Sequence, residues 1–266
     1  MSERSPRPRP APLAGWYATH GRHDLPWRAS RDRWAVLVAE VMLQQTQVAR
    51  VEQAWEPFLV AFPDPQTAAA AGPGALIAAW GRLGYPRRAR RLWEAASRVT
   101  EHGWPDDLTE LPGVGAYTAG AVAAEADDAD TVALDVNIRR VVERVEGGRL
   151  SRHDAETATR QLGSRLSGRD RLLALMDLGA LVCTARTPAC PTCPLHRVCA
   201  TRGPLPDERR SRQAAFAGSF REKRGIVLAA LRAGPTPVAG LDAEALASLV
   251  ADGLAEVRGA TASLPR

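Results

Sequence analysis

Apolar residues recur at helical spacing along most of the chain. One stretch, DRWAVLVAEVMLQQTQVARVEQAWEPFLVAF, predicts a single long helix or two helices. Further helices are predicted for ALIAAWGRLG, RRARRLWEAASRVTEHG, AYTAGAVAAEA, NIRRVVERVEGG, HDAETATRQLGSRL and DRLLALMDLGALV. Clusters of Gly, Pro and Asp such as FPDP, AGPG and LPGVG separate them, and the alternating pattern of strands is scarce. The body of the chain is therefore predicted to be all-α.

The two ends of the chain follow other patterns. Residues 1–13 alternate Arg with Pro, which predicts a disordered, extended, basic arm rather than a secretory signal. Residues 201–219 have the composition of a linker. After it, within 215–266, an amphipathic helix, a second helix and a small β-wing are predicted, and this tail resembles a shrunken winged-helix unit. A packing appendage without a function of its own is the alternative.

Composition and charge narrow the function classes. With 45% apolar and 24% charged residues, the 266-residue chain has the profile of a water-soluble globular protein. It lacks the run of about 18 apolar residues that a membrane-spanning helix needs. The net charge of +5 weakly favours a polyanionic partner. Lys223 is the only lysine, so almost no amine is available for Schiff-base chemistry.

The cysteines form one group near the end of the helical body. Their spacing is C-x6-C-x2-C-x5-C, and the members are Cys183, Cys190, Cys193 and Cys199. In a cytosolic protein such a group indicates a metal site rather than disulfides. Four thiolates around one centre suit a [4Fe–4S] cluster, whereas zinc usually takes paired C-x2-C knuckles. Here only one pair is close, which favours the cluster and leaves zinc as the alternative.

Two carboxylates stand out from their surroundings. Glu40 is the only charge among the apolar residues 35–43, where ionisation is costly, so its pKa should rise toward the range of a general acid. A structural Glu bonded to a helix end or an arginine is the alternative. Asp135 precedes a predicted helix, which predicts an N-cap, and a cap also keeps a carboxylate ionised near the helix dipole. One neutral acid beside one fixed anion is a pair that breaks glycosidic bonds.

The turn LPGVG opens directly into a predicted helix. Its glycines allow backbone N–H groups to point outward at the helix start, which is a site for a DNA phosphate. An ordinary turn between helices has the same composition. The position of this turn about twenty residues before Asp135 favours the phosphate site.

Taken together, LPGVGAYTAGAV and LDVNIRRV resemble the hairpin and the catalytic-Asp segment of the helix-hairpin-helix DNA glycosylases. The cysteine spacing is similar to that of the iron–sulfur branch shared by endonuclease III and adenine glycosylases. Within this branch LPWR, EVMLQQTQV, GRLGYPRRA and MDLGALVCT resemble the MutY-type adenine glycosylases. The resemblance covers about residues 14–205. It implies an all-α fold of two lobes: a six-helix lobe over 29–134, and a cluster lobe combining 14–28 with 135–214.

The resemblance also implies roles for single residues. Glu40 would protonate the flipped adenine and Asp135 would stabilise the oxocarbenium-like sugar. Tyr117 and Asn137 would orient these carboxylates, and Arg28 would position adenine or Glu40. The remaining implied residues contact DNA: Gln45 and Tyr85 as wedges in the base stack, and the backbone of Gly113, Val114 and Gly115 as the phosphate grip. Endonuclease III has a catalytic lysine after the hairpin, where this chain has Tyr117, so a monofunctional glycosylase is implied.

Some positions depart from the family pattern. The tail is far shorter than the Nudix-like domain with which classical members read 8-oxoguanine, and Pro86 and Val136 stand where Tyr and Gly are frequent. We expect a monomer that acts on double-stranded DNA with adenine opposite 8-oxoguanine or guanine, cytoplasmic and nucleoid-associated, with no membrane partner. The alternatives are a thymine–guanine mismatch glycosylase of the same branch and a non-catalytic DNA-structure-binding protein. MLQQT and the presence of both carboxylates argue against them.

Overall fold

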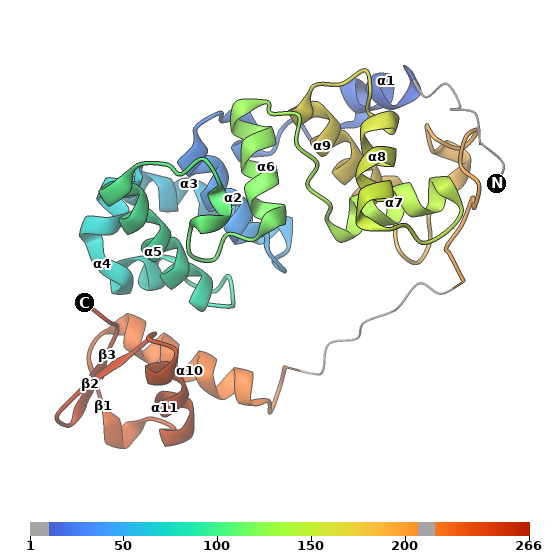
Figure 1. The fold of residues 1–266 in the computed structure, drawn as a ribbon. Coiled ribbons are helices and arrows are strands. Elements are labelled where there is room, and N and C mark those ends of the chain that lie inside the picture. Colours follow the sequence, from blue (N-terminus) through green and yellow to red (C-terminus); the bar gives the residue numbers. More distant parts are fainter. Residues whose placement is uncertain (1–10, 207–215) are drawn as a thin grey trace. The chain divides into compact units, whose positions relative to one another are not determined.

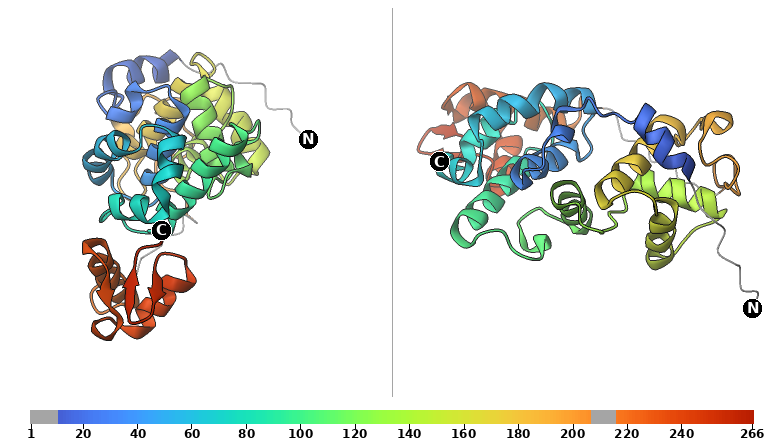
Figure 2. Two further views of the ribbon diagram at one scale, coloured as in Figure 1. Left: turned by 90° about the vertical axis from the view of Figure 1, so that its left-hand side faces the viewer. Right: turned by 90° about the horizontal axis from the view of Figure 1, so that it is seen from above.

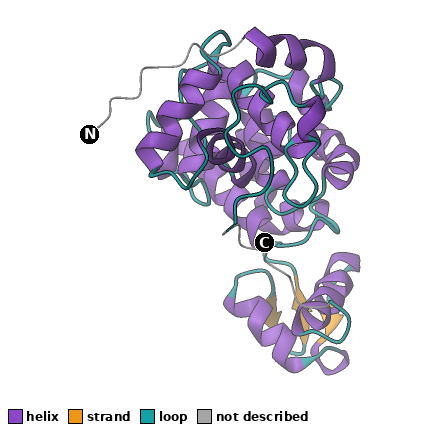
Figure 3. Cartoon of the chain, turned by 90° about the vertical axis from the view of Figure 1, so that its right-hand side faces the viewer, coloured by secondary structure: helices purple, strands orange, loops and turns teal. Residues whose placement is uncertain are grey.

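A computed structural model describes residues 11–206 and 216–266, and helices dominate it, as predicted (Figure 3). The described residues form two compact units. The first unit comprises 11–36 and 116–206, and the second comprises 37–115 and 216–266. Over these residues, no helix is both long and apolar enough to cross a membrane.

Five α-helices build the first unit around one apolar core (Figure 1). They are α1 (Ala11–His20), α6 (Ala116–Asp127), α7 (Val136–Glu146), α8 (Arg152–Leu162) and α9 (Gly168–Asp177). Short helical turns follow or separate them: η1 (Pro26–Ala29), η3 (Leu178–Val182) and η4 (Cys190–Thr192). Helix α9 is central, because it contacts α1, α6 and α7, and its Leu175 is fully buried.

The second unit contains the remaining helices of the body. They are α2 (Arg33–Leu43), whose first turn belongs to the first unit, α3 (Val48–Ala61), α4 (Pro65–Ala79), α5 (Arg87–His102) and the turn η2 (Leu108–Glu110). The long apolar stretch thus forms two helices, because the backbone leaves helical geometry at Gln45, with φ of 55°. AGPG breaks α4, where Gly72 takes φ of 81° before Pro73, which lacks the N–H that a helix interior needs.

The tail forms a helix, a strand, a second helix and a hairpin. These are α10 (Phe220–Ala233), β1 (Thr236–Pro237), η5 (Val238–Gly240), α11 (Ala243–Ala251), β2 (Glu256–Arg258) and β3 (Thr261–Ser263). The antiparallel sheet has the order β1-β3-β2, with Ala262 opposite both Thr236 and Val257 (Figure 2, left). Leu228, Leu246 and Ala262 are buried between helices and sheet.

The tail contacts the body of its unit at a few points. A Cβ at Gly74 of α4 would collide with the carbonyl oxygen of Pro265, so the chain end after β3 passes close to this glycine. Arg232 donates from Nε to the carbonyl of Ile77 at 3.1 Å.

The expected lobes and the observed units have different boundaries. Helix α6, expected in the six-helix lobe, is grouped with the first unit, and the tail is grouped with the second. Residues 1–10 of the predicted arm, and 207–215 of the predicted linker, lie outside the described residues. Residues 11–13 of that arm already belong to α1. The lobe assignment over 29–134 and 135–214 stays a prediction.

Candidate active site and cysteine pocket

Glu40 lies on α2 with 4% of its surface exposed. The apolar stretch around it makes α2 a buried helix, and Val36 and Leu37 on neighbouring positions are each 1% exposed. Asp32 caps the helix start, because its Oδ1 accepts the Ala35 N–H at 2.8 Å. The sequence therefore places a carboxylate in apolar surroundings. Glu40 belongs to the second unit and Asp135 to the first.

Asp135 is the N-cap of α7, as its position before the helix predicted. Its Oδ1 accepts the backbone N–H of Ile138 at 2.6 Å, and its Oδ2 accepts the side-chain amide of Asn137 at 2.6 Å. Both carboxylate oxygens are thus bonded to donors. These two bonds fix the orientation of the carboxylate at the start of α7.

The amide of Asn137 is itself fixed from the other side. Its Oδ1 accepts Nη2 of Arg140 at 2.8 Å, and Arg140 also donates to the carbonyls of Cys183, at 2.7 Å, and Gly179, at 2.6 Å. A chain of hydrogen bonds therefore runs from Asp135 to the residue where the cysteine segment begins. Arg140 was not among the residues that the sequence singled out, since it is one arginine among many in the helical pattern.

Arg28 forms a buried ion pair with Asp177. Its two terminal nitrogens donate to the carboxylate of Asp177 at 2.6 and 2.8 Å, and Arg22 adds its backbone N–H at 2.9 Å and Nε at 2.7 Å. Asp177 is fully buried. Burial alone would raise the pKa of Asp177, but the hydrogen bonds and charge of Arg28 outweigh it and hold that pKa below its usual range. The sequence did not identify Asp177, the last residue of α9, which stands among apolar residues in MDLGALVC.

Tyr117 lies in the first turn of α6 and is half-buried. Its hydroxyl donates to the sulfur of Met176 on α9 at 3.6 Å. Tyr117, Asn137 and Asp135 all belong to the first unit, together with Arg28.

The two expected wedge residues share an unusual backbone. Gln45 and Tyr85 are exposed and take positive φ values of 55° and 47°, which non-glycine residues adopt rarely. Buried Arg88 joins their loops, because it donates to the carbonyl of Gln44 at 2.6 Å and to that of Gly84 at 3.0 Å. The sequence did not predict this link, although Arg88 stands in the quoted GRLGYPRRA.

The turn LPGVG lies directly before α6. Gly113 takes φ of 80°, and a Cβ there would be 2.8 Å from the Cβ of Arg91, so only glycine fits this position without strain. The N–H of Val114 donates to the carbonyl of Leu111 at 3.1 Å and is thus used within the turn. Gly115 is exposed with open space around its Cα. The phosphate grip by this turn stays a prediction.

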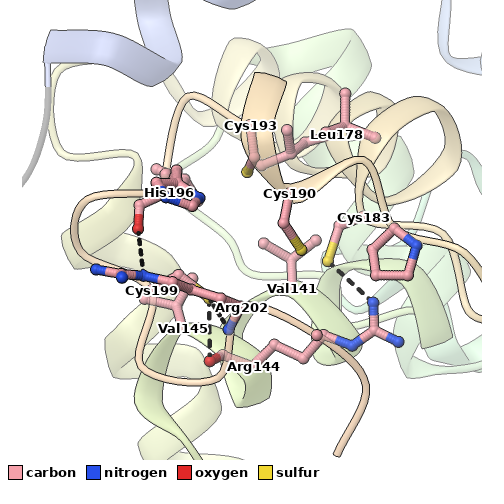
Figure 4. A pocket seen from close by; sticks show the side chains of 14 residues that line it. Val141, Arg144, Val145, Leu178, Cys183, Cys190, Cys193, His196, Cys199 and Arg202 are labelled. Carbon is pink, nitrogen blue, oxygen red and sulfur yellow. Dashed lines mark hydrogen bonds between the residues drawn. The ribbon is translucent and has the colours of Figure 1, made fainter.

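The four cysteines, which all lie within residues 183–199, line one pocket of the first unit (Figure 4). Its four thiols are those of Cys183, Cys190, Cys193 and Cys199. Arg144, 1% exposed, donates to Sγ of Cys183 at 3.3 Å, and the backbone N–H of Arg202 donates to Sγ of Cys199 at 3.4 Å. Burial raises the pKa of the Cys193 thiol to about 11.

The donor set of this pocket bears on which metal centre it suits. Among the described residues, no three Cys, His, Asp or Glu side chains are close enough together to hold a metal ion. Four cysteine thiols around one pocket are the ligand set of a Cys₄ zinc site and also of an iron–sulfur cluster. N–H groups donate to two of the sulfurs, those of Cys183 and Cys199.

Comparisons with known proteins identify the family. The model of the HhH-GPD superfamily of base excision DNA repair proteins matches residues 38–166. An adenine DNA glycosylase of Mycolicibacterium smegmatis is 42% identical over 274 positions, which cover 93% of this chain and 92% of that protein. A thymine-DNA glycosylase of Aeropyrum pernix is 34% identical over 202 positions, covering 70% of this chain and 91% of that protein. A solved thermostable thymine-DNA glycosylase superposes with a TM-score of 0.64 at 27% identity, covering 72% of this chain and 94% of that chain.

The all-helical body and the hairpin before α6 thus define the class: helix-hairpin-helix proteins of base excision DNA repair. The match to the mycolicibacterial protein extends through almost the whole chain, and at 42% identity it settles the family. The chain belongs to the adenine DNA glycosylases of this superfamily, and it is a hydrolase of N-glycosyl bonds. About 19 of the 266 residues lie outside that match. The tail, residues 216–266, is longer than this, so the match includes part of the tail.

Proposed function

We propose that this enzyme removes adenine paired with 8-oxoguanine or guanine, and that it is monofunctional and acts as a monomer on double-stranded DNA. One observation carries the proposal: a buried carboxylate, Glu40, occurs with a carboxylate fixed by donors at a helix start, Asp135. Two carboxylates in different environments can take the separate roles of proton donor and charge stabiliser. Glycosidic bonds are cleaved by such pairs.

In the proposed reaction Glu40 donates its proton to N7 of adenine as the bond between the base and C1′ of the sugar breaks. The bonding electrons leave with the base, which departs neutral. Asp135, held by Asn137 and Ile138, stabilises the positive charge that develops on the sugar. Water then adds to C1′, and its proton returns to Glu40. The products are free adenine and an abasic site.

The scarcity of lysine supports hydrolysis rather than strand cleavage. Tyr117 occupies the position after the hairpin that resembles the lysine position of endonuclease III. Lys223, the only lysine, lies on α10 of the tail and pairs with Asp242 at 3.2 Å. A Schiff-base intermediate requires an amine at the reacting sugar. We therefore expect intact abasic DNA as the product.

We also propose that the cysteine pocket holds a [4Fe–4S] cluster, with Cys183, Cys190, Cys193 and Cys199 as its ligands. The cluster would supply a rigid, redox-capable centre to the segment that begins at Cys183. Iron and acid-labile sulfide analysis of protein prepared without oxygen tests this. About four of each per chain is the expected result, whereas one zinc per chain would contradict the proposal.

Single-turnover base release from three duplexes tests the substrate. The duplexes carry adenine opposite 8-oxoguanine, adenine opposite guanine, and thymine opposite guanine. Adenine release that is fastest opposite 8-oxoguanine is expected. The 34% identity to a thymine-DNA glycosylase favours the third duplex as the second candidate, and thymine release with no adenine release would refute the proposal.

A further inference from the structure

A second pocket, with a volume of about 220 Å³, lies in the second unit between α2, the start of α5 and the LPGVG turn before α6. Its apolar side is formed by Leu37, Val41, Leu92 and Ala95. Its polar lining comes from Gln44, Arg87, Arg88, Arg91 and the turn residues Pro112, Gly113 and Val114. Three arginines and no carboxylate line this pocket, so it attracts anions.

Arg88 contributes a buried positive charge to the pocket. It is 9% exposed, its hydrogen-bond acceptors are carbonyl and hydroxyl oxygens, and its Nε has no acceptor. No described carboxylate pairs with it, and burial lowers its pKa to about 10. The guanidinium also lies 5.3 Å from the ring centre of Trp80 and 5.4 Å from that of Tyr85. A buried cation without a counter-ion gains from a nearby anion.

Arg91 brings a second charge next to the hairpin. It is exposed, and its Cβ packs so closely on Gly113 that a Cβ there would be 2.8 Å away. The guanidinium of Arg91 is thus tethered beside the backbone of the turn. A group bound here would meet side-chain charge from α5 beside the backbone of the turn.

Arg87, the third arginine, already has an anionic partner in the tail. The carboxylate of Asp252, the residue after α11, accepts a hydrogen bond from Arg87 and another from Nη2 of Arg224 at 2.5 Å. The backbone carbonyl of Asp252 accepts a hydrogen bond from Nη1 of Arg90 at 2.6 Å. The side chain of Asp252 is 9% exposed, whereas that of Arg87 is 63% exposed. Arg87 is therefore shared between the pocket and the tail.

We propose that this pocket binds a phosphate group, and that Asp252 of the tail competes with that phosphate for Arg87. The site is built from side-chain charge on α5 and differs in this from the backbone grip expected of the turn. The phosphate has two possible sources, a DNA backbone or free inorganic phosphate. If the phosphate belongs to DNA, the proposal depends on the proposed function in one respect, namely that the protein binds duplex DNA.

The salt dependence of binding to an undamaged duplex tests the site, because no base excision is needed. Each phosphate contact adds about 0.9 to the slope of log K against log salt. Arg91→Ala, which keeps the Cβ against Gly113, is expected to reduce the slope by about 1, and Arg91→Lys is expected to restore it. The matched control is Arg98→Ala, on the same helix but outside the pocket and paired with Glu110 at 3.1 Å. Equal slopes for Arg91→Ala and Arg98→Ala would exclude a DNA phosphate.

Titration with inorganic phosphate, followed by ³¹P NMR, separates the two sources. Binding that Arg91→Ala abolishes, with an unchanged duplex slope, assigns the pocket to free phosphate. Loss of both assigns it to the DNA backbone. If Arg91→Ala changes neither, the pocket is not a phosphate site and the proposal is overturned. Normal adenine release by that variant would at the same time leave the proposed function intact.

Substitution of the tail carboxylate tests the competition. Asp252→Asn is expected to raise duplex affinity at low salt by about two- to fivefold, the range for an ion pair in which one partner, here Arg87, is exposed. Glu244→Gln on α11 removes the same charge from an exposed residue outside the pocket and serves as the control. A gain that is equal in both variants, or a loss in Asp252→Asn, would show that Asp252 does not compete for Arg87.

Discussion

Replacing Asp135 with Asn separates its role as a helix cap from its charge. Oδ1 accepts the Ile138 N–H at 2.6 Å, and Asn is as good an N-cap as Asp, so this bond survives. Oδ2 accepts the Asn137 amide at 2.6 Å, and an amide nitrogen in its place would face another donor. Asn137 cannot invert freely, because its Oδ1 binds Arg140 at 2.8 Å. One charge-assisted bond is therefore lost.

The expected sizes of the two effects differ clearly. Loss of that bond lowers the free energy of unfolding by about 1–2 kcal/mol, near the value for a hydrogen bond to a charged group. Asp135→Ala also removes the cap and costs about 1 kcal/mol more. The rate of adenine release should fall by about 10²–10³ in both variants, or about 2.7–4 kcal/mol, as when a group that stabilises transition-state charge is removed.

Urea unfolding measures the first effect and single-turnover release from the adenine–8-oxoguanine duplex measures the second. The decisive comparison is between the two variants, since Asp135→Asn is the more stable but should be equally inactive. Release by folded Asp135→Asn within tenfold of the parent rate would refute the assignment of Asp135 as the charge that stabilises the sugar.

Three further outcomes follow from the contacts described above. Asp177→Ala leaves Arg28 buried without its partner and should lower the free energy of unfolding by about 3–5 kcal/mol in urea, and a loss below about 1 kcal/mol would contradict this. The folded pKa of Asp177 is lowered, so its ionised carboxylate stabilises the folded state fully above the ordinary carboxyl pKa. This stabilisation is lost as the pH falls through the folded pKa. The unfolding free energy of Asp177→Asn should therefore depend less on acid pH than that of the parent. Gly113→Ala, with φ of 80° and a contact of 2.8 Å to Arg91, should lower unfolding free energy by about 1–3 kcal/mol and weaken duplex binding, as seen by thermal melting and titration. Gly115→Ala, which meets nothing within 4 Å, is the matched control, and equal losses in both variants would count against the strain.

Local features of this protein follow from the sequence by itself. The apolar spacing predicted the helical body because a helix repeats its contacts within a few residues. The cap at Asp135 was predictable for the same reason, since Oδ1 reaches a backbone N–H only three residues away. The grouping of the cysteines in one short segment likewise indicated a common site. The resemblance to adenine glycosylases, which the comparisons confirmed, assigned the class of chemistry.

Contacts between distant segments were decided by the tertiary structure alone. Arg28 and Asp177 lie 149 positions apart, and Arg87 and Asp252 lie 165 apart, so no local pattern pairs them. Arginine is frequent in this sequence, and helical spacing does not show which arginine will be buried against carbonyl oxygens, as Arg88 is. Short-range periodicity determines where helices form, whereas burial and charge pairing depend on which helices meet, and that is settled only when the whole chain has packed.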